Sequence, residues 1–142
     1  MRAVCQGPTI PGMRRGTAPL VLAAVLLAGG TPASAAKVVP RFTAYFTPAF
    51  TDSAYQKAAA DRVLKAWKAP AGAPVGKKTV LIALIGTDGK LAGLRDHMTT
   101  GFKPWDDAAI AAVKAAAPFP PLPKSWGYPT MEVHFHFEAA AK

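Results

Sequence analysis

The segment 130–138 alternates between apolar and polar side chains, and this pattern limits the possible folds more than any other feature. Met131, Val133, Phe135 and Phe137 take one set of alternate positions, and glutamates and histidines take the other. Successive side chains of a β-strand point to opposite faces, so the segment predicts a strand with one buried face. A single strand cannot bury a face by itself, so the chain must build a sheet and cover it.

Residues 78–85 carry the second strong strand signal. The run is apolar at nearly every position, which is typical of a central strand covered by helices. Asp88-Gly89 follows it and predicts a β-hairpin with a type I′ turn, after which residues 91–97 return antiparallel.

Two helices are predicted around these strands. Asp52 or Ser53 can cap the first, which runs to about residue 68. Its apolar stripe contains Ala60, Val63, Leu64 and Trp67. The second begins near Pro104, with Asp106 and Asp107 at its positive end. It ends before the proline-rich segment 118–123, which predicts a rigid crossover with Phe119 and Leu122 in the core.

These elements predict an α+β domain over residues 53–142 in the order α-β-β-α-β. Its three-stranded antiparallel sheet would pack on two helices. Residues 37–52 are interpreted as an extended lead segment. A three-stranded sheet has two edges, and residues 130–138 are expected to form one of them.

Residues 1–36 have the features of a signal peptide. Arg14 and Arg15 precede a short apolar run at 18–28, and small residues suited to cleavage follow at 33–36. Met13 also heads a typical signal sequence, so translation can begin there. The sequence therefore predicts export to the periplasm, and an uncleaved inner-membrane anchor is the alternative.

Charge and cysteine content exclude several classes of protein. Only 3 of the 17 Lys and Arg residues, and none of the 8 acidic ones, fall in residues 1–36, so residues 37–142 keep a net charge of +6. Because this charge is spread evenly along the sequence, it favours acidic partners or the anionic cell surface over nucleic acid. The one cysteine, Cys5, rules out an internal disulfide framework. Neither a Gly-x-Ser-x-Gly motif nor a phosphate-binding glycine loop is present, so no enzyme and no cofactor is predicted.

Several of these motifs occur in an order that resembles the C-terminal domain of the TonB/TolA family. They are Gly-Thr-Asp-Gly-Lys at 86–90, Thr-Gly at 100–101, the helix at 105–113, the proline-rich crossover at 117–123 and the final alternating strand. The resemblance covers about residues 54–138. It implies a small periplasmic domain of a Gram-negative cell, without an active site, that grips envelope or outer-membrane partners. An inner-membrane motor pulls on such domains through a long linker.

The strand pattern and the resemblance together predict binding by strand addition at residues 130–138. An extended partner segment would pair with the exposed main chain there. The predicted partner-binding residues are Trp126, Tyr128, Met131, Val133, His134, Phe135 and His136.

Two alternatives stay open at this stage. The first is an energy transducer anchored in the inner membrane, although the lead segment at 37–51 can reach only about 50 Å and is short for a linker. The second is a periplasmic metal-binding protein. It would use His134 and His136, which share one strand face, with His97 and the flanking Glu132 or Glu138 as further ligands.

Overall fold

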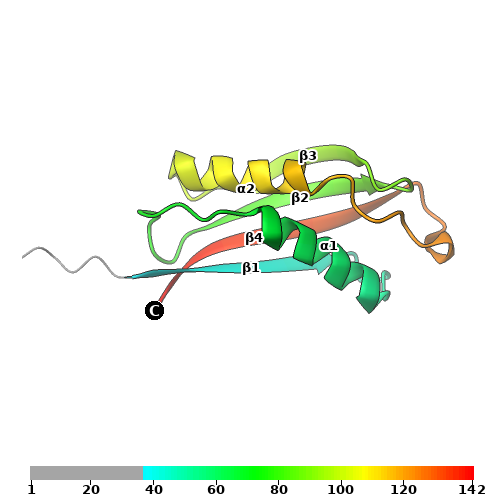
Figure 1. Ribbon diagram of the computed structural model, residues 1–142, viewed down its shortest axis with the longest axis horizontal. Coiled ribbons are helices and arrows are strands. Elements are labelled where there is room, and N and C mark those ends of the chain that lie inside the picture. The colour runs from blue at the N-terminus through cyan, green and yellow to red at the C-terminus, as the bar shows by residue number, and fades with distance from the viewer. Residues whose placement is uncertain (1–36) are drawn as a thin grey trace, which may run out of the picture. The chain divides into compact units, whose positions relative to one another are not determined.

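The computed structural model describes residues 37–142, which form a four-stranded antiparallel sheet with two helices (Figure 1). The strand order is β1-β4-β2-β3. The elements are β1 (Val38–Phe46), α1 (Ser53–Ala66), β2 (Lys78–Gly86), β3 (Leu91–Met98), α2 (Lys103–Ala116), the short 3-10 helix η1 (Lys124–Trp126) and β4 (Thr130–Ala141). The α+β class is therefore confirmed, with four strands in place of three. The predicted signal peptide lies outside the described residues.

The additional strand comes from the segment that the sequence analysis interprets as a lead. Its side chains alternate, with Phe42, Ala44 and Phe46 packed against the core, while Arg41 and Tyr45 are exposed. This alternation was visible in the sequence, but a proline at position 40 made the segment look unlike a strand.

The expectation that residues 130–138 form a sheet edge is wrong. β4 pairs with β1 through residues 133–141 on one side and with β2 through residues 130–138 on the other. Val133, for example, lies opposite both Phe46 and Ala83. The first strand of the domain thus occupies the position at which a partner strand was expected.

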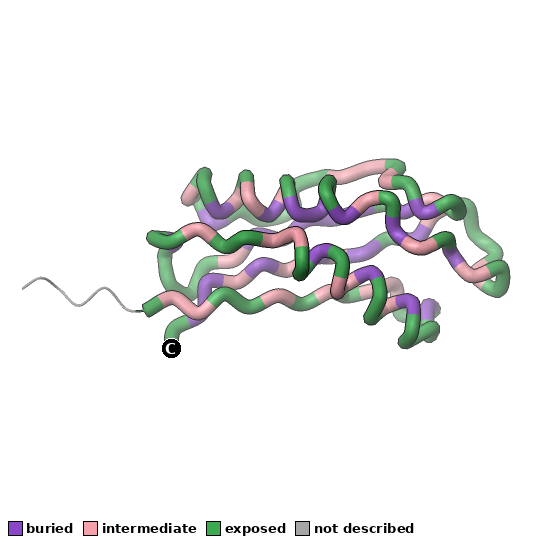
Figure 2. The backbone as a smooth tube through the Cα atoms, in the orientation of Figure 1, coloured by how far each residue is buried: buried purple, intermediate pink, exposed green. Residues whose placement is uncertain are grey.

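Both helices cover one face of the sheet, and the core lies between the two layers. Figure 2 shows buried stretches along the helices, and burial alternates along β4. α1 begins at the predicted cap, where Asp52 accepts a hydrogen bond from the Tyr55 N–H at 2.9 Å. Its buried side is formed by Tyr55, Ala59 and Val63. The predicted stripe is only partly correct, since Leu64 is 51% exposed.

The proline-rich crossover enters the core as predicted. Phe119 and Leu122 are both buried, and the Phe119 ring stacks on Phe135 with centroids 6.1 Å apart. The crossover is also bonded to the β2–β3 hairpin, because the Phe119 N–H donates to the Gly89 carbonyl at 2.8 Å.

The β2–β3 hairpin is confirmed, but its turn is not of type I′. That turn needs positive φ at both central residues, and Asp88 does not have it, while Gly89 has φ +81°. The Asp88 carboxylate instead accepts a hydrogen bond from the Lys90 N–H at 3.0 Å. When an aspartate side chain accepts a hydrogen bond from the backbone N–H two residues further along the chain, it forms an Asx-turn, which differs from a type I′ turn.

Asp106 attaches the start of α2 to the sheet. The sequence analysis predicted only that its charge would lie at the positive end of the helix. One oxygen of its carboxylate, Oδ1, accepts hydrogen bonds from the Thr79 hydroxyl, the Thr100 hydroxyl and the Thr100 N–H. Thr79 and Thr100 are both buried. Asp107 has a different partner, an exposed ion pair with Lys103 on the same helix.

We expect Asp106→Ala to lower the free energy of unfolding by about 2–3 kcal/mol, because it leaves buried donors on Thr79 and Thr100 without an acceptor. Urea denaturation followed by circular dichroism measures the change. Asp106→Asn is the matched control, since its amide oxygen can still accept, and it should cost about 1 kcal/mol. Equal losses in the two variants would show that these hydrogen bonds do not matter.

Candidate functional site

Three of the predicted partner-binding residues belong to the core. Met131, Val133 and Phe135 are 0% exposed and face the helices. The alternation identified their common face correctly, but that face is covered by the second layer of the domain. These three side chains therefore cannot contact a partner in the folded state.

His134 and His136 lie on the other face of β4, which no helix covers. The open face is defined here by the outward side chains Arg41, Thr43 and Tyr45 of β1, Glu132, His134, His136 and Glu138 of β4, Val80, Ile82 and Leu84 of β2, and Arg95 and His97 of β3. The His97 and His134 rings are 6.5 Å apart, and the Tyr45 ring packs edge-on against His136 at 4.7 Å. Polar and aromatic groups thus cover the apolar centre that β2 contributes.

The electrostatic environment keeps His136 neutral over a wider pH range than a free imidazole. Burial lowers its pKa most, and the positive charge of Lys78 and the neighbouring His134 and His97 lower it further. Glu138 opposes the shift. His134 has a different partner, since its Nε2 lies 2.7 Å from the Glu132 Oε1.

The geometry does not support a metal site on this face. Within residues 37–142, no group of three or more histidine, cysteine, aspartate or glutamate side chains is arranged to hold a metal ion. The Nε2 of His134 is also engaged by Glu132.

Trp126 and Tyr128 lie next to one another at the end of the sheet where β4 begins. Trp126 is half-buried, packs edge-on against Phe50 at 5.3 Å and donates its indole N–H to the Thr130 carbonyl at 3.0 Å. The Tyr128 ring lies 5.1 Å from Trp126 and is 64% exposed. Trp126 therefore supports the loop, and Tyr128 is the side chain available for contact.

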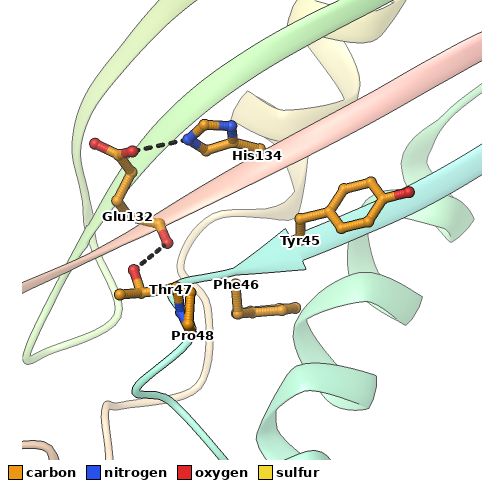
Figure 3. A pocket seen from close by; sticks show the side chains of 6 residues that line it. All are labelled: Tyr45, Phe46, Thr47, Pro48, Glu132 and His134. Carbon is orange, nitrogen blue, oxygen red and sulfur yellow. Dashed lines mark hydrogen bonds and ion pairs between the residues drawn. The ribbon is translucent and has the colours of Figure 1, made fainter.

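Three hollows meet around Glu132 on the open face. The first, of about 290 Å³, is shown in Figure 3, where Thr47 donates to the Glu132 carbonyl at 3.0 Å. It is lined by Tyr45, Phe46, Thr47, Pro48, Glu132 and His134. The second, of about 430 Å³, extends to Tyr128, and the third, of about 300 Å³, extends to Gly93 and Arg95 on β3.

The sequence analysis missed Tyr45, Leu84 and Arg95 as parts of this surface. The signal for Tyr45 was present in the alternation of residues 41–46, which places it on the same side as Arg41 and Thr43. Leu84 and Arg95 carry no local signal, because only the sheet order brings them near Glu132.

The unpaired main chain of the described sheet lies on its two outer strands, β1 and β3. β1 contains Pro40, which lacks an N–H group. β3 contains no proline but has two register shifts against β2.

Comparison with known proteins agrees with this architecture. Residues 52–137 match the family described as TonB C terminal, a stretch that runs from the cap of α1 into β4. No curated protein and no solved structure matches the chain. The matched stretch is more than half of the sequence and contains both helices and the three strands of the resemblance. The chain belongs to the TonB C-terminal family.

Proposed function

We propose that this protein is a periplasmic, non-catalytic adaptor that binds an extended segment of another envelope protein at the free edge of β3. Domains of this family are interaction domains of the cell envelope and carry no active site. The signal-peptide features of residues 1–36 support the periplasmic location.

The observation that carries this proposal is the position of β3 at the end of the sheet order. An edge strand presents unpaired N–H and C=O groups, and an added peptide strand can pair with them. β4 cannot accept such a strand along residues 133–138 because both of its sides are paired there. Of the two outer strands, β3 is favoured because Pro40 removes a donor from β1.

The hollow next to β3 supplies side-chain specificity. It is lined by Ile82, Leu84, Gly93, Leu94, Arg95 and Glu132. An added strand would direct every second side chain toward the open face, where this hollow lies. Its floor favours an apolar side chain, while Arg95 and Glu132 favour a partner with charged groups of both signs nearby. A Cβ at Gly93 would lie 3.4 Å from Leu84, so glycine keeps this part open.

An adaptor fits the fold better than an energy transducer. Most of the lead segment, which would have been the linker of a transducer, forms β1 instead. Nine of its residues pair with β4. The apolar run at 18–28, which would be the anchor of a transducer, lies outside the described residues. Within residues 37–142, neither helix is long and apolar enough to cross a bilayer, and this finding does not bear on that run.

Photo-crosslinking in the periplasm tests the proposal. With p-benzoylphenylalanine in place of Arg95 on β3, we expect an adduct with an envelope protein, because that position lies beside the proposed strand. The same residue in place of Thr43 on β1 tests the other edge, and in place of Lys114 it tests the helical layer. Mass spectrometry then identifies the cross-linked segment of the partner.

A synthetic peptide of that segment gives the decisive measurement. Amide hydrogen exchange should slow along residues 91–98 when the peptide binds, since new main-chain hydrogen bonds form there. Protection along residues 38–46 instead would place the site on β1. A peptide that protects neither strand would rule out strand addition altogether.

A further inference from the structure

The open face gathers most of the large apolar side chains that the domain exposes. In the described part of the chain there are six of them, and Tyr45, Leu84 and Met98 lie on this face. Met98 belongs to it because it lies opposite Val80 in the sheet register. Tyr128, the most exposed of the six at 64%, lines a hollow together with Leu84. Tyrosine and methionine are enriched in protein interfaces, so this face is suited to contact a protein.

The open face also carries charges of both signs, and the register gives each of them a fixed place. Glu138 on β4 lies between Arg41 on β1 and Lys78 on β2, which are its partners in the two registers. Within residues 37–142, these three side chains form no ion pair with one another. A second row, four residues away on β4, crosses all four strands from β1 to β3 and consists of Tyr45, His134, Ile82 and Arg95.

These two rows are complementary to themselves. If a second copy faces the first across a twofold axis that runs along the strands between β4 and β2, each row meets its own reverse. Glu138 then faces Lys78 of the second copy, and Lys78 faces its Glu138. The exposed Tyr45 ring faces Arg95 of the second copy, whose guanidinium can stack on it. The Leu84 side chains of the two copies meet beside the axis.

The other twofold arrangement has its axis across the strands, at the middle of the face. It places Glu138 over Glu132 of the second copy, so that two pairs of carboxylates face each other. Like charges brought together in an interface oppose association. The charge pattern therefore favours the axis along the strands.

We propose that the open face binds a second copy of this chain, so that two sheets pack face to face. Packed sheets lie about 10 Å apart, with their strands about 30° from parallel. Four strands at the usual spacing are about 19 Å wide and β2 is about 26 Å long, which gives about 500 Å² per copy. Stable complexes bury about 800 Å² per partner, so we expect a weak dimer with a Kd of about 100 μM.

This proposal goes beyond the proposed function and does not depend on it. In the dimer, the main-chain edge of β3 stays free at the side of the paired sheets. Strand addition at β3 and pairing of the open faces therefore succeed or fail independently of each other.

Sedimentation equilibrium of the protein expressed from the full chain, at concentrations up to about 1 mM, measures the association. Glu138→Lys and Lys78→Glu should each weaken the dimer at least tenfold, because each places like charges face to face at both symmetry-related contacts. An equimolar mixture of the two variants should recover the affinity of the unmodified protein, since each altered charge then meets its opposite on the other copy. Circular dichroism confirms that each variant is folded.

Two controls make the test specific. Lys114→Glu on α2 changes the net charge as Lys78→Glu does, and it should alter the Kd less than twofold. Cross-linking locates the axis in the background of Cys5→Ser, which removes the native thiol. A short bismaleimide should link two copies of Leu84→Cys efficiently. It should not link copies of Thr43→Cys, on the same face but far from the axis, or of Leu64→Cys on α1.

Four outcomes would overturn the proposal. The first is a protein that stays monomeric up to the highest concentration. The second is a mixture of the two charge variants that associates no better than either variant alone. The third is an equal effect of Lys114→Glu and Lys78→Glu, which would mean that net charge alone acts. The fourth is cross-linking at position 64 that matches cross-linking at position 84, which would place the contact on the helical layer.

Discussion

Replacing Val133 with proline is expected to unfold the domain. Val133 is fully buried in β4, and its neighbours across the sheet are Phe46 and Ala83. Because β4 is paired on both sides, the N–H at this position has a partner strand whichever way it points. Proline removes that donor and leaves a buried acceptor unpaired, and its ring disturbs the packing. The cost is about 4 kcal/mol or more, a large part of the stability of a small domain.

Thermal unfolding followed by circular dichroism measures this effect. A matched control exists on β1, where a proline is native. The tolerance of Pro40 implies that its nitrogen faces away from β4, and residues two or four positions along a strand face the same way. Ala44→Pro should therefore cost about 1 kcal/mol and leave a folded domain. A folded Val133→Pro variant would contradict the central position of β4.

Gly89→Ala is expected to cost about 3–4 kcal/mol. Gly89 has φ +81°, a conformation that is strained for alanine by about 1–2 kcal/mol. A Cβ there would also lie 1.9 Å from the Phe119 carbonyl oxygen, so the hairpin and the crossover must move apart. That movement breaks the hydrogen bond from the Phe119 N–H to the Gly89 carbonyl and weakens the one from Leu122 to Thr87. Each contributes about 1 kcal/mol.

Gly76→Ala separates the two causes. Gly76 has the same φ of +81°, but a Cβ there meets nothing within 4 Å. Its loss should be limited to the backbone strain of about 1–2 kcal/mol. Urea denaturation of both variants gives the comparison. Equal losses would show that the contact with Phe119 does not constrain position 89.

The sequence was sufficient for elements whose signals are local. The cap at Asp52, the glycine of the hairpin and the prolines after α2 each act on their own neighbours, and the structure places both helices and the hairpin there. The burial of Phe119 and Leu122 was also predictable, because a proline-rich crossover offers few alternatives to packing inward. The family resemblance is confirmed by the matched stretch.

The candidate site was harder to predict because edge status is a property of the whole sheet. Alternation shows that Phe135 and His136 face opposite sides of β4, but it does not show which strands lie beside them. The arrangement depends on β1, whose proline weakened its strand signal.

The pairing of the first strand with the last has a consequence for biogenesis. Val38 lies opposite Ala141, so the contact spans nearly the entire domain sequence. Bringing such distant segments together is slow. The chain between them must lose conformational entropy before the stabilising contacts can form. The sheet cannot be completed until the end of the chain has been synthesised and has emerged, and until then Phe42 has no partner on β4. The core beneath this side of the sheet therefore forms late, after the last strand has joined the first.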